Sequence, residues 1–424
     1  MTHNIFDYFK KYENVPNGAI VKEDMLRLGV SFAPEVFEHV DGYLLKNYNL
    51  FASNYDRANT GEMVVKNIPA EIRISSSKNK ILPTIVETRY SAISPYKITY
   101  DQKGFKLLFK EREIAEVEFC KRPKYHNKQF KDGIKYKDVV ALVHWGYKIA
   151  ISVVRVCSFN KNDICKYCDI NTNLKFRTDS NKLNIDPLAK LEYVVPVVKE
   201  ILENEQIEGS RTLVYGLTGG TMLKNGKSIE ADIYSHYIKK LKAEVGGRYP
   251  VSVTCTAQNE DDLWKLKEAG LDVYQCNIEV WDKQIFHKVC PGKSKLVGHD
   301  KWVELLKKAV DIFGEGNVIT NFVAGVEYSK AYGFSTMEEA IQSTTDGFEY
   351  LMYHGITPKM TSFCASAGSS LRNEPIIPLD YYVQIAMNWY NLWRKYLLPP
   401  VRNHGPMGPG RAIEINSTYN DIGS

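Results

Sequence analysis

The stretch CSFNKNDICKYC, residues 157–168, decides the interpretation of this chain because it places three thiols close together. Cys165 and Cys168 form a Cys-x2-Cys knuckle that can present two sulfurs to one metal centre, and Cys157 can return to the same point after a loop of seven residues. Three thiolates on a four-iron cluster leave one iron without a protein ligand, so that a small molecule can bind there. The same knuckle occurs in structural zinc sites, which normally have four ligands. The motif by itself leaves both metals open.

The composition describes a chain with ample apolar content and nearly balanced charge. It has 424 residues, 44% of them hydrophobic, and its 55 Lys and Arg against 50 Asp and Glu give a formal net charge of +5. That charge is too small for this length to indicate nucleic acid as a partner. The sequence MTHNIFDYFKKYENVPNG lacks the apolar core of a signal peptide, and no run reaches the roughly eighteen apolar residues of a membrane span. We therefore expect a cytoplasmic protein with no membrane partner, whose eight cysteines are reduced.

Strand and helix signals alternate after the motif. The clearest helix covers 300–313, where Trp302, Leu306 and Phe313 fall on one face. The expected strands lie at about 149–156, 212–218, 251–255, 272–279, 317–324 and 359–364. Strands that alternate with helices favour a parallel sheet, so the sequence predicts an α/β fold with a partial (β/α)6 barrel of the TIM type. Ligands of such folds bind at the C-terminal ends of the strands, which is where the motif lies.

The region before the motif has a different texture. Residues 64–120 contain several runs of β-branched and aromatic residues separated by turn signals. Helices are expected to begin at Pro34 and, after the motif, at Asp186 and Pro187. The sequence thus predicts three parts, which are a small N-terminal α+β domain with a basic linker (1–140), the partial barrel (141–370), and a C-terminal helical extension and tail (371–424).

The motif, in the setting of this barrel, resembles the cluster loop of the radical S-adenosylmethionine (SAM) superfamily. The familiar spacing between the cysteines is three residues and then two, whereas this chain has seven and then two. Tyr167, directly before the last cysteine, matches the family pattern, and the texture of the barrel is most similar to that of biotin synthase and HydE. The resemblance covers about residues 148–366. It implies a [4Fe-4S] cluster on Cys157, Cys165 and Cys168, with SAM as the second cofactor.

The resemblance also implies where SAM would bind. The end of the second strand is similar to the glycine motif whose backbone holds the amino group of SAM, and its residues are Thr218, Gly219, Gly220 and Thr221. Many members have Glu where this chain has Thr221. Lys288 and Lys293 follow the fourth strand, and they either pair with a carboxylate of SAM or of the substrate or are solvated surface lysines.

Two further short matches concern the nucleoside part of SAM. Asn277 and Glu279 resemble an amide and an acid that bind the ribose hydroxyls, and alternation along a strand points both to one side. Val323 and Gly325 resemble the motif beside the adenine, and Tyr167 would support the adenine from the cluster loop.

The activity that the resemblance implies is reductive cleavage of SAM. One electron from an external donor, such as flavodoxin or ferredoxin, would give methionine and a 5′-deoxyadenosyl radical that acts on a small biosynthetic substrate. Rearrangement, sulfur insertion, ring formation and adenosyl addition all stay open as the later reaction. So do the catalytic residues of that stage.

Two alternatives compete with this interpretation. Residues 119–138 hold seven Lys or Arg against two Asp, interleaved with aromatic residues, so an enzyme that modifies RNA or protein is one alternative. We favour a solvated linker for this stretch. The other alternative, from a different class, is a zinc-stabilised α/β binding protein without catalysis.

Five cysteines lie outside the motif. They are Cys120, Cys255, Cys276, Cys290 and Cys364. They lack the close spacing of a second cluster, and we expect them to be small buried side chains that bind no iron.

Overall fold

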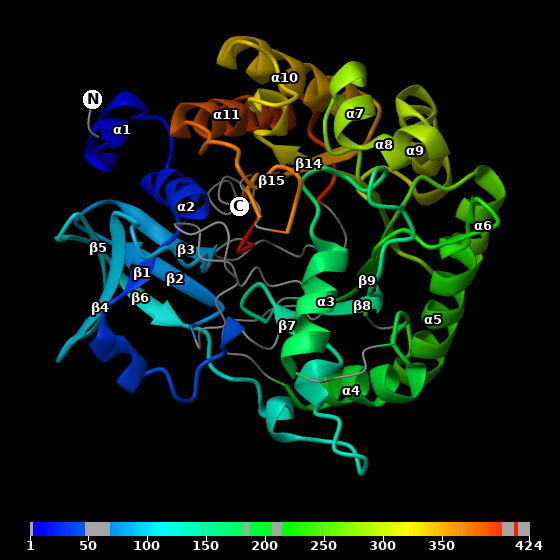
Figure 1. Ribbon diagram of the computed structural model, residues 1–424, viewed down its shortest axis with the longest axis horizontal. Coiled ribbons are helices and arrows are strands. Elements are labelled where there is room, and N and C mark those ends of the chain that lie inside the picture. Colours follow the sequence, from blue (N-terminus) through cyan, green and yellow to red (C-terminus); the bar gives the residue numbers. More distant parts are fainter. Residues whose placement is uncertain are drawn as a thin grey trace.

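The computed structural model describes residues 3–46, 68–146, 148–181, 186–205, 214–247, 249–366, 368–400 and 411–413. These residues form two large sheets that lie beside one another, and most helices are arranged around the second sheet (Figure 1). Of the expected C-terminal extension, α11 (Leu379–Tyr396) is a helix, while 401–410 and 414–424 lie outside the described residues.

The first sheet has six strands in the order β1-β4-β5-β6-β2-β3. Its strands are β1 (Ser31–Phe32), β2 (Glu71–Ser76), β3 (Ile81–Glu87), β4 (Tyr96–Asp101), β5 (Gly104–Phe109) and β6 (Arg112–Phe119). Only β1 and β4 pair in parallel; the other pairs are antiparallel. The five longer strands are the β-rich runs expected from the sequence, because alternating apolar side chains such as Ile72 and Ile74 are buried on one face. Two helices precede them, α1 (Ile5–Lys11) and α2 (Asn17–Leu28).

The second sheet is the predicted partial barrel. Its order is β15-β14-β13-β12-β9-β8-β7, and the six strands β8 to β15 in this order are parallel to their neighbours. They are β8 (Lys148–Val154), β9 (Val214–Gly219), β12 (Val251–Cys255), β13 (Val273–Cys276), β14 (Val318–Ala324) and β15 (Thr357–Ser362). These are the six expected strands, so the predicted α/β fold is confirmed. An unexpected edge strand, β7 (Ala141–Val143), pairs antiparallel with β8, and a small hairpin, β10 (Leu223–Lys224) and β11 (Lys227–Ser228), follows β9.

Helices cover the outer face of this sheet and form an arc in Figure 1. They are α4 (Leu191–Asn204), α5 (Glu230–Val245), α6 (Glu260–Glu268), α7 (Lys283–Val289), α8 (Pro291–Leu296), α9 (His299–Phe313) and α10 (Met337–Tyr353). The apolar face of α9 is buried as expected, with Trp302, Leu306 and Ala309 all inaccessible to solvent. Short 3-10 helices are η1 (Pro34–Glu38), η3 (Lys124–Asn127), η4 (Tyr136–Asp138) and η5 (Val326–Tyr328). Among the helices described, none combines the length and apolar character that crossing a bilayer requires.

Two expected helix starts were wrong. Pro34 opens only the short 3-10 helix η1. The helix expected from Asp186 begins at Leu191 instead, because the residues between run beside the end of β8. There the amide of Ala189 donates to the Val153 carbonyl, and that of Arg155 donates to the carbonyl of residue 187. A helix that was not expected, α3 (Ile170–Asn181), follows the cysteine motif directly.

Helix α2 joins the two sheets. It packs on β3 of the first sheet and also on β15 and α11. Its Glu23 accepts a hydrogen bond of 2.9 Å from the hydroxyl of Ser362 on β15, and its Lys22 donates to the carbonyl of Arg411. The first sheet is therefore fixed against the barrel through buried polar contacts.

Candidate functional site

The three cysteines of the motif line one cavity at the C-terminal ends of the barrel strands, as do most of the proposed SAM residues. We call it the cluster cavity. Its volume is about 150 Å³, and the lining includes Cys157, Cys165, Tyr167, Cys168, Gly219, Gly220, Thr221, Glu230, Thr254, Cys255, Thr256, Asn277, Glu279 and Lys293. Among the described residues no three His, Cys, Asp or Glu side chains are already arranged around a single ion. The fold nevertheless brings the three expected cysteines to the cluster cavity.

The cysteine loop is anchored at its start and in its middle. The side-chain amide of Asn171, on α3, accepts a hydrogen bond of 2.8 Å from the Cys157 amide and donates one of 3.1 Å to the Cys157 carbonyl. In the middle of the loop, the Gly292 amide on α8 donates to the Asp163 carbonyl at 2.8 Å. A Cβ atom at Gly292 would lie 2.6 Å from that carbonyl oxygen, so a glycine is needed for this close approach. These contacts hold the loop before any cofactor binds.

The glycine turn after β9 is packed against the start of the same loop. A Cβ atom on Gly219 would lie 2.1 Å from the Val154 carbonyl oxygen, and one on Gly220 would lie 2.2 Å from that of Val156. The Gly220 amide donates to the Val154 carbonyl at 2.9 Å. Both glycines are therefore required by contact between two backbone segments. Thr218 lies one step earlier and faces a second cavity, described below.

Glu279 and Lys293 form a buried ion pair in the cluster cavity. Lys293 Nζ lies 2.5 Å from Glu279 Oε1 and donates to the Asn277 carbonyl oxygen at 2.9 Å. Burial tends to lower the pKa of Lys293, but the Glu279 carboxylate and the Cys165 and Cys290 sulfurs oppose this, and the net shift of its pKa is upward. Lys293 is therefore a buried, paired lysine beside the cysteine motif and not a solvated surface lysine.

A fourth cysteine lies next to the motif. Cys290, at the end of α7, is fully buried and interacts with the thiol of Cys165. Its sulfur is 3.8 Å from the hydroxyl oxygen of Tyr167. The interaction with Cys290 lowers the pKa of Cys165, and Lys293 lowers it further against the effect of burial, whereas burial raises the pKa of Cys157 and Cys168. Sequence spacing gave no signal for this proximity, because Cys168 and Cys290 are 122 positions apart in the chain.

The sequence interpretation missed an acid in the cluster cavity. Glu230 is buried at the start of α5, where it accepts hydrogen bonds from the Ser228 hydroxyl at 3.0 Å, from the Thr256 amide at 3.3 Å, and from the Thr256 hydroxyl. Burial raises its pKa to about 7. The hairpin β10–β11 separates it from the glycine turn in sequence but returns it to the same cavity. This acid therefore lines the same cavity as Thr221, the position at which the resembled motif often has Glu.

Besides Thr218, three residues of the proposed SAM set lie outside the lining of the cluster cavity. Lys288 is exposed on α7 and is absent from the described linings of both cavities. Val323 is half-buried on β14 and is likewise outside those linings. Gly325 follows β14 with φ +104°, and a Cβ atom there would lie 2.8 Å from the Tyr382 hydroxyl oxygen. Gly325 thus allows α11 to approach the sheet.

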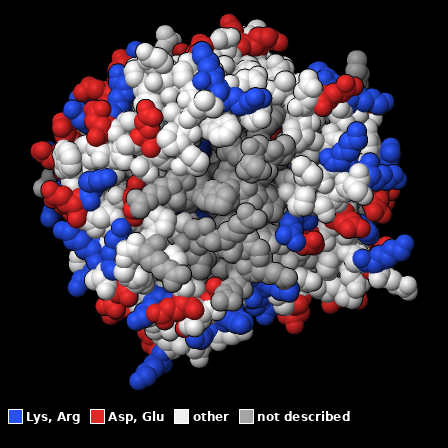
Figure 2. All heavy atoms as spheres, turned by 180° about the vertical axis from the view of Figure 1, so that it is seen from behind, with Lys and Arg blue, Asp and Glu red and all other residues white. Residues whose placement is uncertain are grey.

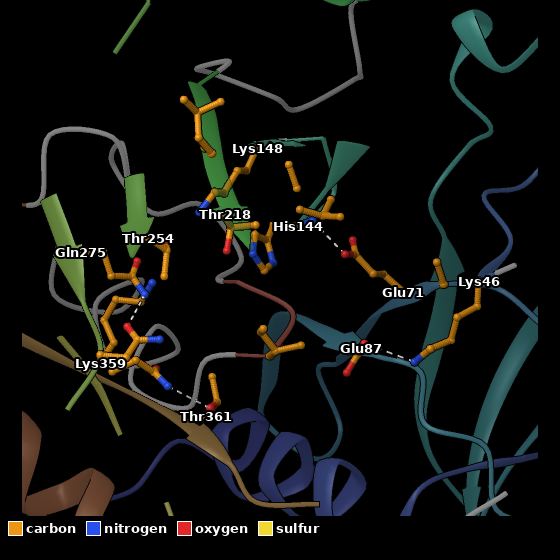
Figure 3. A pocket seen from close by; sticks show the side chains of 18 residues that line it. Lys46, Glu71, Glu87, His144, Lys148, Thr218, Thr254, Gln275, Lys359 and Thr361 are labelled. Carbon is orange, nitrogen blue, oxygen red and sulfur yellow. Dashed lines mark hydrogen bonds and ion pairs between the residues drawn. The ribbon is translucent and has the colours of Figure 1, made fainter. Parts of the chain in front are cut away.

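A second cavity, which we call the barrel chamber, lies between the curled sheet and the first sheet (Figure 3). Its volume is about 310 Å³. The barrel contributes Lys148, Ala150, Gly216, Leu217, Thr218, Thr254, Gln275, Asn277, Asn321, Lys359 and Thr361, and other segments contribute Lys46, Ala70, Glu71, Glu87, Val143, His144 and Ile413. Thr254 and Asn277 line both cavities, so the two spaces adjoin.

The basic stretch 119–138 forms a separate surface feature. Arg122, Lys128, Lys135 and Lys137 line a hollow of about 400 Å³ at the surface. Lys128 is paired with Glu200 at 2.7 Å, and Arg122 with Asp41 at 2.8 Å. Figure 2 shows acidic and basic residues interspersed over one described face of the molecule, without a continuous basic patch on that face.

No family model matches the chain. Over 230 residues it is 25% identical to bacteriochlorophyllide c C-7(1)-hydroxylase of Chlorobaculum limnaeum, and the match covers 52% of this chain and 54% of that protein. The chain thus spans about half the length of this curated relative.

Three solved structures are similar to this chain at low sequence identity. Methylornithine synthase (PylB) is 14% identical with a TM-score of 0.41, covering 63% of this chain and 71% of its own. The [FeFe]-hydrogenase maturase HydG is 17% identical with a TM-score of 0.39, and the match covers 58% of this chain and 50% of HydG. Coproporphyrinogen III oxidase (HemN) of Escherichia coli, a radical SAM enzyme, is 14% identical with a TM-score of 0.31, and the match covers 47% of this chain and 44% of HemN.

The cysteine loop, the glycine turn and the pair of Asn277 and Glu279 lie together at one end of a six-stranded parallel sheet. These are the residues on which the resemblance of the sequence to the radical SAM superfamily rests, and the chain is similar over about half its length to the hydroxylase.

Proposed function

We propose that this chain is a radical SAM enzyme whose cluster is bound by Cys157, Cys165 and Cys168 and whose SAM lies in the cluster cavity. The observation that carries the proposal is that these three cysteines share one cavity with the glycine turn and with Glu279. Three thiols suit a cluster with one open iron, and the cationic Lys293 beside Cys165 suits a site that accumulates thiolate charge.

The chemistry that the cofactors would supply here is one-electron cleavage of SAM to methionine and a 5′-deoxyadenosyl radical. The chain itself supplies binding and orientation. Glu230 offers a buried carboxylate near the glycine turn, which suits the ammonium group of SAM. Asn277 and Glu279 offer an amide and an acid for the ribose hydroxyls, and Tyr167 presents a buried ring from the cluster loop.

The substrate in this proposal is a small molecule in the barrel chamber. The chamber adjoins the cluster cavity at Thr254 and Asn277, so a substrate there lies next to SAM without crossing solvent. A volume of about 310 Å³ is at the small end of the range for small-molecule pockets, about 300–1,000 Å³. This volume favours a small substrate. An external electron donor, such as flavodoxin or ferredoxin, completes the proposal.

Anaerobic reconstitution with iron and sulfide tests this function. We expect about four irons and matching labile sulfide per chain, a brown chromophore, and 5′-deoxyadenosine when SAM and dithionite are added. Changing any one of Cys157, Cys165 and Cys168 to Ala should remove the chromophore and the product together. A chain that instead holds one zinc ion and no labile sulfide would contradict the proposal and support the zinc-stabilised binding protein.

A further inference from the structure

We propose that Cys165 and Cys290 form a pair of thiols that a hydroperoxide oxidises to a disulfide whenever the chain holds no cluster. Cys290 is not among the proposed ligands, so the inference gives this buried cysteine a role that the proposed function leaves unassigned. The disulfide would close the site to iron until a thiol reduces it. This last consequence rests on the proposed function, whereas formation of the disulfide does not.

Two backbone hydrogen bonds join the cysteine loop to the turn between α7 and α8. The Lys166 amide donates to the Val289 carbonyl at 2.8 Å, and the Gly292 amide donates to the Asp163 carbonyl at 2.8 Å. Residue numbers rise along one segment as they fall along the other, so the two segments are antiparallel where they meet. The cysteine loop is therefore fixed to this turn on both sides of their point of contact.

Cys165 and Cys290 face each other within this contact. Cys165 directly precedes the amide donor of the first bond, and Cys290 directly follows its carbonyl acceptor. Residues matched in this way across antiparallel segments have Cα atoms about 4.5–5.5 Å apart, and a disulfide needs about 4.4–6.8 Å. The two thiols already interact, and the Cys290 sulfur lies 3.8 Å from the hydroxyl oxygen of Tyr167. A bond between the two sulfurs is therefore compatible with the backbone as it stands.

The competing partner for Cys165 is Cys168 of the same motif. The Cys168 amide donates to the Cys165 carbonyl at 3.0 Å, so these two cysteines lie at the ends of one turn. Cys168 interacts with the charge of Cys165, whereas the Cys290 thiol forms a hydrogen bond with the Cys165 thiol. We therefore assign Cys290 as the partner.

Access from solvent differs between the two thiols. Cys165 lines the cluster cavity, whereas Cys290 is fully buried and is absent from the described lining of that cavity. Hydrogen peroxide therefore reaches Cys165 first and oxidises its sulfur to a sulfenic acid, with release of water. The Cys290 sulfur then attacks the Cys165 sulfur, the S–O bond breaks, and a second water leaves. The two thiols lose two electrons and two protons in total, and hydrogen peroxide takes up both.

The disulfide and the cluster exclude each other. A cysteine binds metal as a thiolate, and a sulfur in a disulfide is not one. Oxidation of Cys165 therefore removes one of the three proposed ligands. The disulfide also stops oxidation at a reversible stage, because thiols do not restore sulfinic and sulfonic acids. The pair would thus protect an empty site from damage and reopen it on reduction.

Disulfide mapping of the cluster-free wild-type chain tests the inference directly. The chain is treated with an equimolar amount of hydrogen peroxide, its free thiols are alkylated, and linked peptides are identified by mass spectrometry without reduction. We expect a loss of about two free thiols per chain and a dominant link between Cys165 and Cys290, both reversed by dithiothreitol. A dominant link from Cys165 to Cys157 or Cys168 would overturn the inference, as would the absence of any link to Cys290.

The variant Cys290→Ser removes the thiol that attacks the sulfenic acid. The sulfenic acid on Cys165 should then persist, so dimedone should label Cys165 several-fold more strongly than in the wild type. Cys120→Ser, which changes a buried cysteine directly after β6 in the first sheet, is the matched control and should keep the wild-type labelling. Equal labelling of Cys165 in the wild type and in Cys290→Ser would contradict the pair.

Iron uptake separates this inference from the proposed function. Reconstituted without added thiol, the oxidised chain should build no cluster, and the same chain after dithiothreitol should take up about four irons. A mapped disulfide in a chain whose reduced form builds no cluster and gives no 5′-deoxyadenosine would support the pair and contradict the proposed function. A cluster and 5′-deoxyadenosine without the disulfide would leave the proposed function standing and overturn the inference.

Discussion

Lys293 and Glu279 form an ion pair with 2.5 Å between Nζ and Oε1, and Glu279 holds its place in a left-handed backbone conformation, φ +74°. A non-glycine residue with positive φ is uncommon and persists where the surroundings determine it strongly. Here the Glu279 amide donates to the Asn321 carbonyl, and its carbonyl accepts from Val323. Glu279 is thus held by backbone and side chain together.

Loss of one partner of this pair should therefore be costly. Lys293→Met leaves the Glu279 carboxylate buried without its cation, and we expect the free energy of unfolding to fall by about 3–5 kcal/mol. Chemical denaturation of the metal-free chain measures this. Lys288→Met on exposed α7 is the matched control and should change stability by less than about 0.5 kcal/mol. In the double variant with Glu279→Gln, stability should recover in part. Simple additivity of the two losses would contradict the coupling.

The contact between the glycine turn and the cysteine loop predicts a loss of cluster without any change of ligand. Gly220→Ala places a methyl group 2.2 Å from the Val156 carbonyl oxygen and must displace the segment that carries Cys157. We expect about 1–3 kcal/mol of destabilisation and reduced iron content after desalting. Gly247→Ala, where a Cβ atom meets no heavy atom within 4 Å, is the control. Normal iron in both variants would show that the turn does not position the loop.

Cys290 lies beside Cys165, so its role can be tested by counting iron. We expect Cys290→Ser to keep about four irons per chain, because three thiolates suffice for the proposed cluster. Cys165→Ser, measured in parallel, should lose them. If the iron content of Cys290→Ser falls instead, Cys290 is a ligand and the cluster has no open iron on the side expected for SAM.

The pH dependence of stability should report on Glu23. Burial raises the pKa of Glu23 to about 8, against the Ser362 hydrogen bond and the positive charges of Lys22 and Arg89, from 4.5 in an unfolded chain. The folded chain keeps this proton where the unfolded chain has lost it. The stabilisation is therefore complete below about pH 4.5 and is lost as the pH rises towards 8, by a few kcal/mol.

Glu23→Gln should flatten this part of the stability curve, because the amide has no proton to lose over this range. Denaturation of the wild type and the variant at a series of pH values gives the difference directly. Glu38→Gln, which changes an exposed carboxylate, should preserve the wild-type slope. A variant curve parallel to the wild type would show that the Glu23 proton is not held.

Five strands of the first sheet could be predicted because their side chains alternate, and the six parallel strands of the barrel because short apolar runs alternate with helical segments. The short strands β1 and β7 were not expected. The position of the cysteine loop at a strand end followed from the same pattern. The helix start at Leu191 could not, because residues 187–189 satisfy the end of β8, a contact between segments more than thirty residues apart. The expected roles of Val323 and Gly325 rested on short matches, and the position of Gly325 is explained by the approach of α11.

The parts of the site that the sequence did not reveal are those assembled over long distances. Glu230 returns to the cluster cavity only after the hairpin β10–β11, and Cys290 meets Cys165 across most of the barrel. The sequence shows Lys148 only as a residue at the start of a strand, and it does not reveal that the Lys148 side chain lies against Gly216 of β9. The local periodicity of the sequence does not predict such long-range contacts, because they depend on how the sheet curls.

Thr254 and Asn277 line both the cluster cavity and the barrel chamber. In an enzyme that spends one SAM for each reactive event, a partition between cofactor and substrate governs yield as well as affinity. Substitutions at these two positions are therefore expected to change how many molecules of 5′-deoxyadenosine are released per molecule of product. The yield of product per SAM consumed, as well as the binding of substrate, would then depend on the two side chains that line both cavities.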